Sequence, residues 1–111
     1  MDQRTRPRYK NREKIGILAP EDKKLLFEAQ SVDVSSKGVR FESGAELAPE
    51  QNYYIVFGYM KYGKLEVLAQ VLAKYVKDGK QCYSAKFLDE DLMQKTRIRN
   101  YVEKVRGGHA F

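Results

Sequence analysis

Residues 65–88 carry the strongest local structural signal in the chain. Residues 65–76 alternate apolar and polar side chains, Asp78-Gly79 follows, and a second β-prone run occupies residues 81–88. An Asp-Gly pair between two such runs is typical of a tight β-hairpin, because both residues tolerate the positive φ that the turn requires. The segment therefore predicts two long antiparallel strands.

Four further β-prone runs precede this hairpin. One of them changes the parity of its apolar residues halfway, which indicates a β-bulge near Gln30 or Ser31. The polar and glycine-containing segments between the runs are short, as expected for antiparallel neighbours. The four runs are residues 14–19, 25–34, 38–42 and 52–60.

The end of the chain shows a helical period instead. Asp89 is suited to cap a helix, and Gly107-Gly108 is suited to end one. Between them, four apolar residues recur at the spacing of a single helix face. They are Ile98, Tyr101, Val102 and Val105.

Six short strands that must avoid exposed edges favour closure into a small barrel. We therefore predict a mainly β fold, a six-stranded antiparallel β-barrel with a C-terminal α-helix. The 111 residues suit one domain. The expected parts are a flexible basic arm (1–12), the barrel with its helix (13–106) and a tail (107–111).

Several function classes find no support in the sequence. The only histidine, His109, lies beyond the predicted helix stop, so neither a catalytic triad nor a metal site is expected. We expect no enzyme and no cofactor. No apolar stretch is long enough to span a membrane. The single cysteine, Cys82, is expected in the core or the barrel wall, and the expected location is the reducing cytoplasm.

The net charge of +6 is concentrated at the start of the chain, where residues 1–14 hold six cationic and two acidic residues. Such an arm suits nucleic acid, anionic lipid or a small phosphorylated ligand, although a merely solvated terminus has the same composition.

Two short motifs carry specific chemistry. Arg8 and Arg12 form R-x-x-x-R, and Asp33, Ser35 and Gly38 form D-x-S-x-x-G. Guanidinium groups bind phosphates and the Hoogsteen edge of guanine in bidentate fashion. Asp33 and Ser35 offer an acceptor and a hydroxyl to a base or to the arm's own arginines. Gly38 is expected to allow a left-handed turn and a close approach by a ligand.

The two motifs, their separation and the predicted order of strands and helix resemble the PilZ domain family, receptors for the bacterial second messenger cyclic di-GMP. The resemblance implies a stand-alone PilZ-type barrel whose ligand site comprises Arg8, Arg12, Asp33, Ser35 and Gly38. It also implies an arm that folds over the bound nucleotide.

Three further positions are candidates for secondary contacts. Pro7 stands where the family tends to carry an extra arginine, with Arg6 before it, which leaves open whether one nucleotide or a stacked pair binds. Arg40 either reaches the ligand or is a solvated strand residue. Tyr75 matches an aromatic position of some relatives, but its parity favours the core or the barrel rim.

The function expected from this resemblance is that of a non-catalytic cyclic di-GMP receptor that relays its signal to an unidentified protein partner. Motility and biofilm formation are the family's usual themes. The alternatives are a nucleic-acid-binding small β-barrel and a PilZ-like protein-interaction domain that binds no nucleotide. Because the excess charge lies in the arm rather than along a sheet face, no nucleic acid partner is expected.

Overall fold

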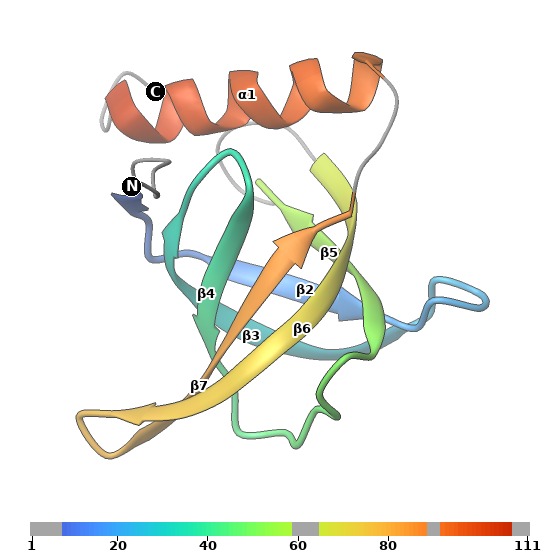
Figure 1. Ribbon diagram of the computed structural model, residues 1–111, viewed down its shortest axis with the longest axis vertical. Helices are drawn as coiled ribbons and strands as arrows, with labels where there is room; N and C mark the ends of the chain where they lie inside the picture. Colours follow the sequence, from blue (N-terminus) through green and yellow to red (C-terminus); the bar gives the residue numbers. More distant parts are fainter. Residues whose placement is uncertain (1–7, 59–64, 89–91, 108–111) are drawn as a thin grey trace.

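The computed structural model describes residues 8–58, 65–88 and 92–107, and Figure 1 shows the arrangement of these segments. Strands form where the β-prone runs lie, and the amphipathic stripe forms a helix. The elements in chain order are β1 (Tyr9–Lys10), β2 (Lys14–Leu18), β3 (Leu25–Val34), β4 (Gly38–Glu42), β5 (Asn52–Phe57), β6 (Leu65–Lys77), β7 (Lys80–Phe87) and α1 (Leu92–Gly107).

Six of the strands close into a barrel in the order β3-β2-β5-β6-β7-β4, because β4 also pairs with β3. Every pairing is antiparallel. The predicted six-stranded antiparallel barrel with a C-terminal helix is therefore confirmed. Closure removes the free edges that an open sheet of this size would expose.

One strand was not predicted. Tyr9 and Lys10, in the segment expected to be a flexible arm, form β1 and pair with Val34 and Asp33 of β3. The end of the arm that carries the R-x-x-x-R motif is thereby placed beside the D-x-S-x-x-G turn. Residues 1–7 lie outside the described part of the chain.

Three register shifts adapt the strands to the curved wall. The pairing of β2 with β3 shifts between Ile17 and Leu18. The pairing of β3 with β4 shifts between Ser31 and Asp33, next to the position predicted for a bulge. The pairing of β6 with β7 shifts between Val71 and Ala73. Bulges increase twist and bend a strand, as closure of a small barrel requires.

The predicted hairpin turn is confirmed, since Asp78 and Gly79 have φ values of 53° and 76°. The β6–β7 hairpin extends away from the end of the barrel on which α1 lies (Figure 1). The predicted capping residue Asp89 and the second glycine of the helix stop, Gly108, lie outside the described residues.

The helix covers one end of the barrel with its predicted apolar stripe, and all four stripe residues are buried. Tyr101 packs against Phe57 of β5 with ring centroids 5.2 Å apart. Cys82 is a buried free thiol in β7, which confirms its expected place in the barrel wall, and burial raises its pKa.

Candidate functional site

Asp33 is the centre of a cluster of charged side chains at the junction of β1, β3 and β4. Its backbone pairs with Lys10 on one side and Arg40 on the other. Arg8 Nε donates to Asp33 Oδ1 at 2.7 Å. Arg40 Nε lies 3.0 Å from both carboxylate oxygens, and its Nη2 donates to Oδ2 at 2.5 Å. One carboxylate therefore holds two guanidinium groups, one from the residue before β1 and one from β4.

The electrostatics of Asp33 follow from this geometry. Its side chain is only 11% exposed. Burial alone raises the pKa of a carboxyl group, but the hydrogen bonds from Arg40 and Arg8 outweigh burial and bring the pKa of Asp33 below its usual value. The same bond raises the pKa of Arg40. Asp33 is therefore a permanent anion at neutral pH.

Ser35 organises the turn between β3 and β4. Its buried Oγ accepts hydrogen bonds from the backbone N–H groups of Lys37 at 3.1 Å and Gly38 at 3.2 Å. Its own N–H donates to the carbonyl of Gly38 at 2.9 Å. Arg8 Nη1 reaches Ser35 Oγ at 3.5 Å, the outer limit of a hydrogen bond. The hydroxyl thus shapes the turn and lies at the margin of the arginine cluster.

The left-handed turn expected at Gly38 is wrong, whereas a close approach by a ligand stays a prediction. The described glycines with positive φ are Gly58 and Gly79, so Gly38 does not adopt a left-handed turn. A Cβ at position 38 would lie 2.3 Å from the carbonyl oxygen of Ala85. The close approach is therefore made by β7 of the same chain, because Gly38 begins β4 and pairs with Lys86.

Arg12 is bonded to a different carboxylate from Arg8. Arg12 Nη1 donates to Glu42 Oε2 at 3.2 Å, and 51% of its side chain is exposed. This bond lowers the pKa of Glu42. Asn11, between the two arginines in the chain, is bonded to the barrel: its N–H donates to the carbonyl of Val32 at 3.1 Å.

A small cavity of about 200 Å³ lies at Arg12, and Arg8 is not among the residues that line it. Asp33 and Glu42 line it together with Arg12. The remaining lining residues are Lys10, Val32, Lys77, Asp78 and Cys82. The cavity is smaller than a typical ligand pocket, so a large ligand at this place must lie largely on the open surface or displace the arginine side chains.

Tyr75 lies beside the arginine cluster. Burial raises its pKa. The charges of Arg40 and Arg8 lower the pKa, and that of Asp33 raises it. The parity that grouped Tyr75 with the core ends at the bulge after Val71, and the ring is half-buried. Arg40 was expected either to reach the ligand or to be solvated on its strand. Its side chain is bonded to Asp33 rather than freely solvated. Arg6 lies outside the described residues.

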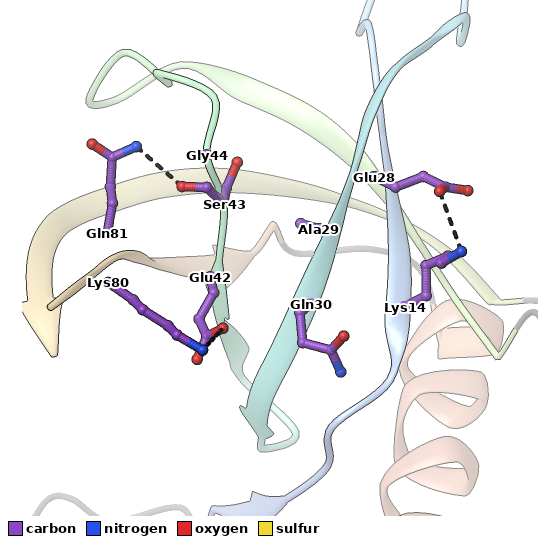
Figure 2. Close-up of a pocket in the computed structure, with 9 residues that line it drawn as sticks. All are labelled: Lys14, Glu28, Ala29, Gln30, Glu42, Ser43, Gly44, Lys80 and Gln81. Carbon is purple, nitrogen blue, oxygen red and sulfur yellow. Dashed lines mark hydrogen bonds and ion pairs between the residues drawn. The ribbon is translucent and has the colours of Figure 1, made fainter. Parts of the chain in front are cut away.

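A larger cavity, of about 600 Å³, lies between β3 and the end of β4 (Figure 2). Its charged side chains are paired with one another. Lys14 lies 3.5 Å from Glu28, and Lys80 lies 3.8 Å from Glu42. These pairs leave little excess charge for an anionic ligand, in contrast to the cluster at Asp33.

Sequence reasoning missed three residues that fix the arm to the barrel and the helix. Asn11 Nδ2 donates to Glu13 Oε1 at 2.9 Å and to the hydroxyl of Tyr101 at 2.7 Å. Tyr101 was recognised only as an apolar stripe residue. No spacing rule connects residues 90 positions apart in the chain. The only sequence signal for Asn11 was its place inside the R-x-x-x-R motif.

The described residues were compared with the requirements of metal sites and membrane spans. Within the described ranges, no group of three or more His, Cys, Asp or Glu side chains is arranged to hold a metal ion. In the same part of the chain, no helix has both the length and the apolar character needed to cross a membrane.

The described residues form a closed six-stranded barrel with an end-capping helix and an arginine-carboxylate cluster at its rim. The model of the PilZ domain family matches residues 2–104. This chain therefore belongs to the PilZ domain family, as its motifs suggested. A comparison with curated proteins finds no match.

Solved structures share the fold. The PilZ domain of Escherichia coli YcgR, solved with c-di-GMP, aligns with a TM-score of 0.75 at 16% identity over 96% of this chain and 93% of that one. The K. pneumonia MrkH–c-di-GMP complex aligns with a TM-score of 0.75 at 13% identity, over 96% of this chain and 53% of that one. The Bacillus subtilis inhibitor of motility MotI aligns with a TM-score of 0.72 at 12% identity, over 98% of this chain and 53% of that one. The chain thus spans about half of each of the last two proteins.

Proposed function

We propose that this protein is a bacterial cyclic di-GMP receptor without catalytic activity, which binds the nucleotide through Arg8, Arg12, Asp33, Ser35 and Gly38. The observation that carries the proposal is the cluster in which Asp33 holds Arg8 and Arg40 beside a cavity lined by Arg12. Membership of the PilZ family and the c-di-GMP complexes of YcgR and MrkH support the choice of ligand.

The chemistry of the cluster suits a cyclic dinucleotide. The ligand carries two phosphates, which guanidinium forks bind by charge-assisted hydrogen bonds. Its guanines present N7 and O6 acceptors to arginine and flat faces to Tyr75 and to the guanidinium planes. Asp33 keeps Arg8 and Arg40 oriented before the ligand arrives, which lowers the ordering cost of binding.

Arg12 is the arginine that changes partner in this proposal. Its ion pair with Glu42 is solvent-exposed, and pairs of this kind are worth only about 0–1 kcal/mol. A phosphate therefore displaces Glu42 easily, whereas Arg8 at the shielded Asp33 carboxylate stays in place. The movement of the Arg12 side chain is the rearrangement that a partner would sense.

The receptor passes its signal to another protein in this proposal. Arg97 and Arg99 are exposed on α1, which suits an acidic partner surface. Regulation of motility is the theme favoured by the structural likeness to MotI, an inhibitor of motility, and biofilm formation is the other theme that the family resemblance implies. A cytoplasmic location fits the unpaired thiol of Cys82.

Isothermal titration calorimetry with cyclic di-GMP, the linear dinucleotide and single-stranded DNA tests the proposal. We expect saturable binding of the cyclic ligand and much weaker binding of the other two. Salt-sensitive DNA binding without heat from the cyclic ligand would instead establish the nucleic-acid-binding alternative. No heat from any ligand would favour the protein-interaction alternative.

A further inference from the structure

Asn11, the residue before Arg12, bonds the R-x-x-x-R motif to the rest of the molecule. Its backbone carbonyl accepts a hydrogen bond from the hydroxyl of Ser31 in β3. Its side-chain amide donates to Glu13 at 2.9 Å and to Tyr101 at 2.7 Å. The segment between Arg8 and Arg12 is therefore fixed at Asn11, while the two arginine side chains extend from it toward different acceptors.

Glu13 joins three parts of the fold with one carboxylate. Its Oε1 accepts hydrogen bonds from the amide of Asn11 and from the hydroxyl of Tyr101. Its Oε2 accepts one from the backbone N–H of Gly58, just after β5, at 2.8 Å. Hydrogen bonds to an ionised acceptor are stronger than neutral ones, so this carboxylate is an effective junction.

Tyr101 brings α1 into this junction. Its side chain is buried, with 4% of the residue exposed, and its ring packs against Phe57. The hydroxyl is both the acceptor for Asn11 and a donor to Glu13, which closes a three-membered ring of hydrogen bonds. A buried hydroxyl in such a network has a defined place, and so does the helix that carries it.

We propose that Asn11, Glu13 and Tyr101 are positioning residues that hold the arginine motif against the barrel and couple it to α1. Through them, a change in the arm at the nucleotide site alters the docking of the helix, and a change at the helix alters nucleotide affinity. Such coupling is reciprocal by thermodynamic necessity. The coupling to nucleotide affinity rests on the function proposed above. The anchoring of the arm by these three residues does not depend on it.

Tyr101→Phe tests the anchor, because it removes one hydroxyl and keeps the packed ring. Tyr53→Phe in β5 is the matched control. In unliganded protein, hydrogen exchange should rise in residues 9–13 and in α1 of Tyr101→Phe, and neither segment should change in the control. Affinity for cyclic di-GMP should fall by about threefold to tenfold, the effect of one hydrogen bond.

Ligand-dependent exchange separates coupling from simple structural support. In the wild type, cyclic di-GMP should slow exchange in both residues 9–13 and α1, whereas in Tyr101→Phe the slowing should be confined to the arm. A uniform rise in exchange across the barrel, or an unchanged response of α1, would refute the coupling. Glu13→Gln provides a second variant with the same readout if Tyr101→Phe folds poorly.

The two proposals fail separately. If the wild type binds no cyclic di-GMP, the function proposed above is wrong. The exchange comparison in the unliganded protein still decides the anchor: a rise in α1 alone, with residues 9–13 unchanged, would show that Tyr101 does not hold the arm.

Discussion

Arg8 and Asp33 meet at 2.7 Å although 25 residues separate them in the chain. The contact exists because β1 and β4 flank β3 on opposite sides of Asp33, which brings Arg8 and Arg40 to the same carboxylate. An arm motif and a turn motif thus become one site through strand pairing. The first two predictions concern this carboxylate.

Asp33→Asn should destabilise the protein in a pH-dependent way. The folded-state pKa of Asp33 is lowered, so its contribution to stability is present above the unfolded pKa of about 3.9 and is lost as pH falls through the folded value. The difference in Tm between wild type and Asp33→Asn should therefore be constant near neutrality and shrink below about pH 4. Glu28→Gln, at the exposed pair with Lys14, should change Tm little. A difference for Asp33→Asn that persists unchanged to pH 3 would contradict this expectation.

Asp33→Ala and Arg12→Ala should each weaken cyclic di-GMP binding by about tenfold to a hundredfold. Each removes one or more charge-assisted bonds, or the group that orients them, worth about 1.5–3 kcal/mol. Lys14→Ala, two residues along the chain from Arg12, should leave the affinity within about twofold, because Lys14 pairs with Glu28 away from the cluster. Equal losses in Arg12→Ala and Lys14→Ala would mean that only net charge matters.

Glu42→Gln should tighten binding by about twofold to fivefold. The substitution removes the carboxylate that competes with phosphate for Arg12, and the gain should match the small worth of an exposed ion pair. Calorimetric titration measures the change. Weaker binding in this variant would show that Glu42 orients Arg12 for the ligand instead of competing for it.

Gly38→Ala should lower stability by about 1–3 kcal/mol, because the added Cβ meets the Ala85 carbonyl oxygen at 2.3 Å and backbone must move. Gly44→Ala is the matched control, since a Cβ there meets nothing within 4 Å. Urea denaturation of both variants gives the comparison. Equal urea midpoints for the two variants would show that β4 and β7 can move apart at position 38 without loss of stability.

The fold was predictable where its determinants are local. The Asp78-Gly79 turn and the stripe ending at Val105 follow from the preferences of adjacent residues, and the barrel follows from counting strands that need partners. The motif residues Asp33 and Arg8 were also recognisable, because their spacing matches a known family.

The remaining features depend on tertiary register. Arg12 pairs with Glu42 because of where β4 ends, and Gly38 is required by β7 rather than by its own turn. Tyr101 was predicted only as an apolar stripe residue, because periodicity reports the ring and not the hydroxyl. Such contacts join residues far apart in the chain, so the periodic pattern of the sequence does not predict them.

An NMR titration of isotope-labelled protein with cyclic di-GMP tests the central claim most directly. We predict saturable shifts concentrated at residues 8–12 and 33–40 and at Tyr75, with a smaller response in α1. Shifts confined to the cavity between Lys14 and Lys80, or no saturable shift at all, would contradict the claim.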